Sequence, residues 1–513
     1  MAIELIREAF KVEELKGSNE IQALVETDIY LSPTKPNIEK LLWVQGKVEI
    51  LNTKIIKDKL IISGLARFNV LYRSGEEENN IHSVDTSKEF REELDIEGIR
   101  EDMISKIRSK IEYIEWDLEE ARIQLKALVN LWGEVEEIKT IEAIKEIKAK
   151  DSLQCLKEKV NYKEVHGREI SYALIKDVIR LGDDKPEIDE IVKFSIKTKE
   201  VESMVVDGRI ITSGEAIVNI VYYGQNQIYS HKATLPFNHF VEMPGVNKDL
   251  KGEIGFEVVE GIYEVVGNEL GERKLVDLEI KIRVTGKAYE EKSRELIIDA
   301  YSTKESILLG REEINIKESL KDIKHYEVLN VQIDGIDAKE ILEIEGNTTI
   351  LDKRYVNDDI VIEGILSLDI QYIDRISEEL ASYKGDFPFR SLIIEDPNVG
   401  VIIDVQSSLE SIKHFGNKDS FGVEGSILLR VNLSKNRKIY GIREIKETNE
   451  LIDMKNKPSI TVYIVQKGDV LWDIAKRYNT TTEEILTSNS VLAADLVPGN
   501  KIIIEKKVEM INI

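Results

Sequence analysis

The chain has 513 residues and a formal net charge of −25; 33% of its residues are charged and 9 are proline. This length suggests three to five domains, and the composition is that of a folded chain rather than a disordered one. The negative charge disfavours binding to nucleic acid or to anionic membranes. No uncharged apolar run reaches the roughly 18 residues that would predict a membrane span.

The N-terminal segment lacks the pattern of a secretory signal peptide. Glu4, Arg7 and Glu8 fall where such a peptide needs an apolar run. Cys155 is the only cysteine, so no disulfide can form within the chain. We therefore expect the protein to stay in the cytoplasm of the cell that makes it.

Three segments of similar sequence recur with a spacing of 150 residues: IISGLARFNVLY (61–72), ITSGEAIVNIVY (211–222) and VIEGILSLDIQY (361–372). Each holds a glycine and a final tyrosine at the same place: Gly64, Gly214 and Gly364, then Tyr72, Tyr222 and Tyr372. Apolar and polar residues alternate within them, which predicts β-strands with one buried face. A glycine inside such a strand predicts a bulge or a bend.

The similarity extends beyond these strands. Upstream, Lys35-Pro36 falls on Lys185-Pro186, and downstream three phenylalanines occupy similar settings, namely Phe90, Phe237 and Phe389. A unit of about 150 residues is long enough to close its own core. We therefore expect consecutive domains rather than the stacked turns of a solenoid.

These patterns predict a mainly β fold. Three tandem, sandwich-like repeat domains are expected at 1–150, 151–302 and 303–447. A linker at 448–459 and a small C-terminal βααβ module at 460–507 should follow.

One segment departs from the β pattern. Residues 140–160 read TIEAIKEIKAKDSLQCLKEKV and place Ile141, Ile144 and Ile147 near helical spacing. We expect a helix there, at the join between the first two repeats. Nothing near Cys155 in this segment marks it as a nucleophile.

The C-terminal module begins with the short strand pattern VYIV. Gly468 then allows a sharp turn, and Asp469 is expected to cap a helix over 470–478 by accepting bonds from its first N–H groups. A second helix, which ends near Asn489, should begin with a capping box. Two pairs fit that box, Thr480 with Glu483 and Thr481 with Glu484.

The rest of the module returns as a strand. Pro498-Gly499 suits the two central positions of a type II turn, and KIIIE follows as the closing strand. Three apolar residues are expected in the core of the module, namely Trp472, Ile474 and Leu486.

This module resembles a LysM domain along its whole length. The pattern Y-x-V-x-x-G-D-x-L-W-x-I-A-x-x-Y, then S-N, then L-x-P-G-x-x-I-x-I carries the resemblance. It implies a groove that in LysM domains holds N-acetylglucosamine polymers. The groove residues here would be Gly468, Asp469, Val470 and Leu471 on one side and Asn489, Leu496, Val497 and Pro498 on the other. The family usually has Thr or Ser where Val470 stands, so one possible hydrogen bond to sugar is missing.

Repeated β units followed by a LysM domain resemble the clostridial SPOCS-domain proteins. That resemblance implies a non-enzymatic scaffold of endospore coat assembly in the mother-cell cytoplasm, at the forespore surface. It also implies that the LysM domain binds stage IV sporulation protein A, the ATPase of the coat basement, and that other coat proteins are possible partners.

No pattern typical of catalysis is present. The six histidines do not lie at metal-ligand spacings, and the GxSxG, P-loop and GxGxxG motifs are absent. We expect no catalytic residue, cofactor or metal. One alternative is a peptidoglycan (N-acetylglucosamine polymer) binding protein of the cell wall or spore cortex, against which the missing export signal argues. A hydrolase targeted by LysM is a third reading, but it would need a catalytic domain.

Overall fold

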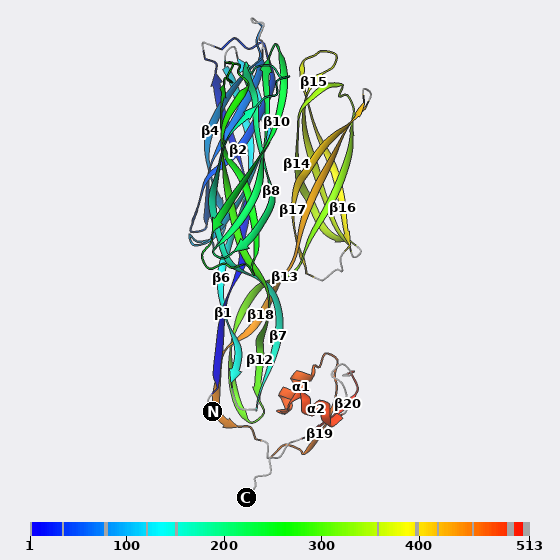
Figure 1. Cartoon of the computed structure of the whole chain (residues 1–513). Coiled ribbons are helices and arrows are strands. Elements are labelled where there is room, and N and C mark those ends of the chain that lie inside the picture. Colours follow the sequence, from blue (N-terminus) through cyan, green and yellow to red (C-terminus); the bar gives the residue numbers. More distant parts are fainter. Residues whose placement is uncertain are drawn as a thin grey trace.

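The computed structural model describes residues 3–32, 35–75, 81–119, 122–148, 152–356, 359–394, 400–417, 420–453, 456–489 and 497–505. These residues form long antiparallel β-strands, with two short helices near the C-terminus (Figure 1). The predicted mainly β fold, with three repeats and a C-terminal βααβ module, is confirmed.

The strands fall into three equivalent sets of six. The first is β1 (Glu4–Tyr30), β2 (Lys40–Ile56), β3 (Lys59–Arg73), β4 (Ile81–Asp95), β5 (Ile104–Glu119) and β6 (Arg122–Lys148). The second is β7 (Leu153–Arg180), β8 (Glu190–Val206), β9 (Arg209–Gly224), β10 (Gln227–Glu242), β11 (Lys251–Val266) and β12 (Leu275–Ser302). The third is β13 (Glu305–Ile333), β14 (Ala338–Val356), β15 (Asp359–Asp374), β16 (Leu380–Ile394), β17 (Ile402–Asn417) and β18 (Ser420–Leu451).

Each repeat folds into a two-layered β-sandwich. In the first repeat, the sheet β2-β3-β4 packs against β1, β6 and β5. Alternate apolar residues meet between the layers, such as Phe68 of β3 and Val129 of β6. The second and third repeats build equivalent cores from their own six strands.

The recurrent glycines lie opposite the recurrent phenylalanines. Gly64 pairs with Phe90 across β3 and β4, and a Cβ atom on Gly64 would stand 2.3 Å from the phenyl ring. The pairing of β2 with β3 slips at the same point, where Leu51 is the extra residue. The slip recurs in the other repeats, at Val201 and Leu351. The predicted bulge is therefore present, with its extra residue on the neighbouring strand.

The outer strands of each repeat continue beyond the sandwich. The parts of β1, β6, β7, β12, β13 and β18 that lie outside the sandwiches converge into one stalk (Figure 1). Its core joins all three repeats, since Phe10 of β1, Tyr162 of β7 and Ile314 of β13 belong to one apolar cluster. The rings of Phe10 and Tyr162 lie 4.8 Å apart.

The helix expected over 140–160 is wrong. β6 runs to Lys148 and β7 begins at Leu153, both within the stalk. Ile141 packs beside Phe10 in one stalk cluster, whereas Ile144 belongs to the next cluster along. The pairing with β1 slips between Ile144 and Glu146, and Ile147 beyond the slip packs in the same cluster as Ile144. This slip changes the phase of the buried face, so strand residues acquire a spacing that imitates a helix.

The three sandwiches also meet in a ring away from the stalk. β4 contacts β8, β10 contacts β14, and β16 contacts β2, so each repeat touches the next. Three equivalent residues, 150 apart, meet at the centre: Trp43, Lys193 and Glu343, which are 7%, 4% and 9% exposed. The Lys193 ammonium forms an ion pair with Glu343 and lies 4.6 Å from the centre of the Trp43 ring.

Candidate functional site

The C-terminal module has the predicted order of elements: β19 (Ile460–Ile464), α1 (Leu471–Tyr478), α2 (Thr482–Asn489) and β20 (Lys501–Glu505). A capping box begins α2, and of the two candidate pairs it is Thr481 with Glu484. The Glu484 amide donates to the Thr481 hydroxyl (3.1 Å), and the Thr481 amide donates to the Glu484 carboxylate (3.2 Å).

Asp469 does not cap α1 as predicted. The N-cap residue is Val470, in an extended conformation and without a side-chain cap. The Asp469 carboxylate instead accepts hydrogen bonds from the Gln466 amide (2.8 Å) and the Tyr463 hydroxyl (2.7 Å). The bond from Gln466, followed by that from Tyr463, lowers the pKa of Asp469. This carboxylate therefore fixes the turn before the helix rather than the helix itself.

The two sides of the predicted groove are brought together by backbone hydrogen bonds. The Val465 amide donates to the Asn500 carbonyl (2.9 Å), and the Gly499 amide donates to the Val465 carbonyl (2.8 Å). The type II turn at Pro498-Gly499 is confirmed, because Gly499 has φ 94° and the Asn500 amide donates to the Val497 carbonyl (3.0 Å).

Two of the residues predicted to line the groove have exposed apolar side chains, Val470 (52% exposed) and Val497 (56%). Gly468 and Pro498 are exposed beside them, and Leu471 is half-buried. Leu496, the remaining residue of that side, lies outside the described residues.

The Asn489 side chain forms its hydrogen bonds within the module. Its amide nitrogen donates to the carbonyls of Ile485 and Ile503 (both 2.7 Å), and its oxygen accepts from the Ile503 amide (2.6 Å). The side chain therefore holds the end of α2 against β20. Its polar atoms are engaged in the fold of the module, as is the Oδ2 oxygen of Asp469.

One face of α1 is docked on the stalk. The Trp472 indole donates to the Asp299 carboxylate of β12 (2.8 Å), and the Lys476 ammonium donates to both oxygens of that carboxylate (2.9 and 2.7 Å). Beside them, the Tyr301 hydroxyl donates to the Thr480 carbonyl (2.7 Å). The Tyr301 ring meets the Trp472 ring edge-on at 4.8 Å. We call this contact the docking interface.

Asp299 is a nearly buried charge at this interface. Burial by itself would raise its pKa, but hydrogen bonds from Lys476 and Trp472 and the charge of Arg311 outweigh that effect, so the pKa of Asp299 is lowered. The prediction that Trp472, Ile474 and Leu486 form the core holds fully for Ile474, which is buried, whereas Leu486 is half-buried. Trp472 is half-buried and shared with the stalk. No sequence signal marked Asp299 or Tyr301, because their partner lies more than 170 residues away.

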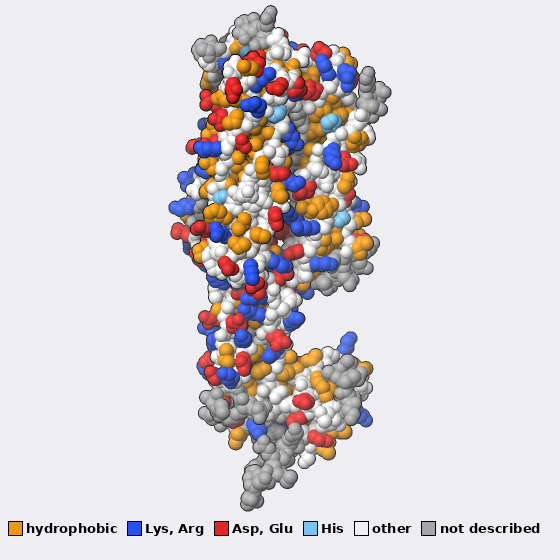
Figure 2. Space-filling model, in the orientation of Figure 1, with side chains coloured by type: hydrophobic (Ala, Val, Ile, Leu, Met, Phe, Trp, Pro, Cys, Tyr) orange, Lys and Arg blue, Asp and Glu red, His pale blue; other side chains and the backbone are white. Residues whose placement is uncertain are grey.

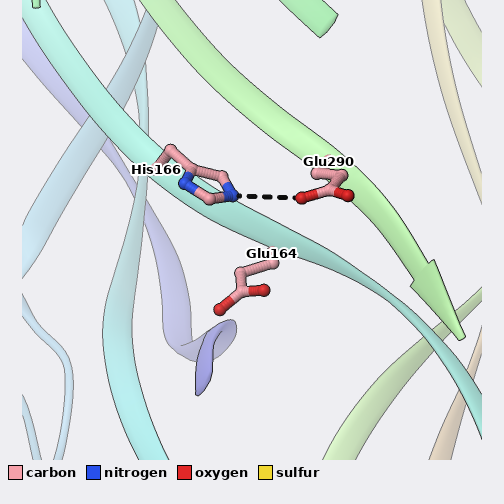
Figure 3. A group of neighbouring side chains, drawn as sticks. All are labelled: Glu164, His166 and Glu290. Atoms are coloured by element: carbon pink, nitrogen blue, oxygen red, sulfur yellow. Dashed lines mark ion pairs between the residues drawn. The ribbon is translucent and has the colours of Figure 1, made fainter. Parts of the chain in front are cut away.

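A second group of polar side chains gathers in the stalk (Figure 3). His166 lies 3.6 Å from Glu290, and Glu164 is close to both. A metal could be held by such a triad, but the Lys292 ammonium already contacts Glu164 (2.8 Å) and Glu290 (3.0 Å). This lysine compensates the two carboxylates, so the group is an ion-pair cluster that supports the pairing of β7 with β12.

Among the described residues, no helix has the length and apolar character that a membrane crossing requires.

Residues 37–119, 187–266 and 337–414 match the family model described as "SipL, SPOCS domain", and residues 463–505 match that of the LysM domain. Each SPOCS match covers the four inner strands of a repeat and leaves out the two long strands that continue into the stalk. No curated protein and no solved structure matches the chain.

Proposed function

Because the chain is a SPOCS-domain protein with a C-terminal LysM domain, we propose that it is a non-enzymatic scaffold of endospore coat assembly. Its LysM domain binds stage IV sporulation protein A, the coat-basement ATPase, in the mother-cell cytoplasm at the forespore surface. The SipL-type SPOCS domains support a role in sporulation. Three linked sandwiches favour a scaffold, since several weak contacts on one chain raise the effective concentration of each.

The observation that carries this proposal is the character of the LysM groove. Its two exposed side chains, Val470 and Val497, are apolar. Asn489 uses its polar atoms within the module, and Asp469 uses its Oδ2 oxygen there. Sugar recognition depends on polar groups that are free to bond hydroxyls, whereas an exposed apolar pair fits the centre of a protein interface.

Glycan binding is the second candidate. The LysM match favours it, and so does the open space beside Gly468, where an added Cβ would meet no atom within 4 Å. In that case N-acetylglucosamine oligomers would bind through backbone groups of the two loops.

The test is calorimetric titration of the full chain with stage IV sporulation protein A and, separately, with N-acetylglucosamine hexamer. We expect protein binding without sugar binding. Val470→Glu and Val497→Glu should each weaken it by about tenfold or more, because a charge would replace an apolar contact. Val462→Glu, at an equally exposed position on β19 (58%), is the matched control. Sugar binding alone would overturn the scaffold proposal for this domain.

A further inference from the structure

A cleft of about 1450 Å³ lies between the sandwiches of the second and third repeats. β8 supplies one wall, β14 and β17 supply the opposite wall, and β2 of the first repeat closes one side. The separation of the third sandwich from the other two is visible in Figure 1, and Figure 2 shows a furrow along the same boundary. The cleft is remote from the LysM domain.

Positive charge gathers in this cleft although the whole chain carries −25. Seven of its exposed basic residues form no ion pair with a described carboxylate: Lys47, Lys197, Lys199, Lys232, Lys281, Lys324 and Arg430. Six carboxylates also line the cleft, and three of them, Glu200, Glu202 and Glu410, form no ion pair with a described residue, so unpaired positive charge exceeds unpaired negative charge by seven to three. The other three are engaged. Glu49 pairs with Arg67, Glu257 with Arg283, and Glu343 with Lys193. The cleft is therefore a cationic site on an acidic protein.

The basic residues are arranged in rows. Lys197 and Lys199 are exposed two residues apart on β8, so they share one face of the strand. On the other repeat, Lys324 of β13 lies directly opposite Arg430 of β18. Alternate side chains of an extended strand are about 6.6 Å apart, so the spacing of the β8 row matches alternate carboxylates of an extended peptide.

Two further features of the cleft favour an extended peptide as its ligand. β8 and β14 are edge strands of their sheets, and edge strands can take up an additional strand. Exposed apolar side chains line the same cleft, among them Tyr172, Val201 and Tyr326. Nucleic acid fits less well, because the charge of −25 would repel a long polyanion that extends beyond the cleft.

We propose that this cleft binds an extended acidic peptide segment of a partner protein, with alternate carboxylates on Lys197 and Lys199 and the opposite edge of the peptide facing Lys324 and Arg430. This site is separate from the LysM groove, and it does not depend on what that groove binds. The scaffold would then hold two partners at once.

The test uses the full chain and a fluorescein-labelled peptide of about twelve residues in which Glu and Val alternate, followed by anisotropy. We expect saturable, salt-sensitive binding that a Lys–Val peptide does not show. The variants Lys197→Glu/Lys199→Glu and Lys324→Glu/Arg430→Glu should each weaken binding by about tenfold or more. These side chains are exposed, so the fold should persist, as thermal melting would verify.

The matched control is Lys88→Glu/Lys248→Glu, which removes the same charge at exposed positions outside the cleft lining and should leave affinity within about twofold. The Lys–Val peptide should gain binding to Lys197→Glu/Lys199→Glu. Absence of binding, or an equal loss in the control variant, would overturn the proposal. Tighter binding of single-stranded DNA, lost in the cleft variants, would replace it with a nucleic-acid site.

Discussion

The sandwiches and the stalk share the long outer strands of each repeat, but their cores draw on the chain in different ways. A sandwich core draws its buried residues from one repeat, whereas the stalk core draws them from all three. The ring centre, with Trp43, Lys193 and Glu343, is shared in the same way. The repeats therefore contact one another in two places, the stalk core and the ring centre. The LysM domain is docked on the stalk.

The largest expected effect is the loss of stability when a buried ring is removed from the stalk core or from a sandwich core. Phe10→Ala in the stalk and Phe68→Ala in the first sandwich each remove a buried ring and should cost about 4 kcal/mol of local stability. Hydrogen exchange should reveal the difference. Phe10→Ala should speed exchange in stalk strands of all three repeats, and Phe68→Ala mainly in the first. If both variants speeded hydrogen exchange in the same strands, the stalk would not couple the repeats.

The ring centre should respond almost as strongly. Lys193→Met leaves the Glu343 carboxylate buried without its partner and should lower the free energy of unfolding by about 3 kcal/mol. The double variant Lys193→Met/Glu343→Leu should recover most of this loss, because no unpaired charge remains. Denaturant unfolding of the two single variants and the double variant would measure the coupling between Lys193 and Glu343. If the losses in unfolding free energy of the single variants simply added in the double variant, the coupling would be refuted.

The docking interface should be weaker. Tyr301→Phe removes one hydrogen bond, to the Thr480 carbonyl, and should destabilise docking by about 1 kcal/mol. Small-angle X-ray scattering would report release of the LysM domain as a larger radius of gyration. Tyr326→Phe, at an exposed ring far from the interface, provides the control. An unchanged profile after both Tyr301→Phe and Trp472→Phe would contradict the docked arrangement.

The smallest expected effect is that of pH near neutrality on the docking of the LysM domain. The pKa of Asp299 is lowered in the folded protein, so its contribution to docking is fully present above the ordinary carboxyl value of 3.8. It is lost only as the pH falls through the lowered pKa. Scattering profiles should therefore stay constant from neutral pH down to about pH 4, and the domain should separate below that. Asp299→Asn should remove this acid transition.

Much of the local structure followed from short-range patterns. The spacing of Gly64, Gly214 and Gly364 predicted repeated strands with irregular pairing, and each glycine faces a phenylalanine beside a bulge. The capping box and the Pro498-Gly499 turn were also predictable, because both depend on a few adjacent residues. Helix spacing failed at Ile144 and Ile147, because a slip in strand pairing between them changes the buried face.

The sequence by itself determined the three repeats, their β character and the LysM pattern, because alternation, turns and caps are written in neighbouring residues. Only the tertiary structure decided that the outer strands share one stalk, that Trp43, Lys193 and Glu343 meet, and that Trp472 reaches Asp299. It likewise assembled the basic cleft from strands of all three repeats. These features join residues more than a hundred positions apart, and no local pattern records which distant partner a side chain will meet.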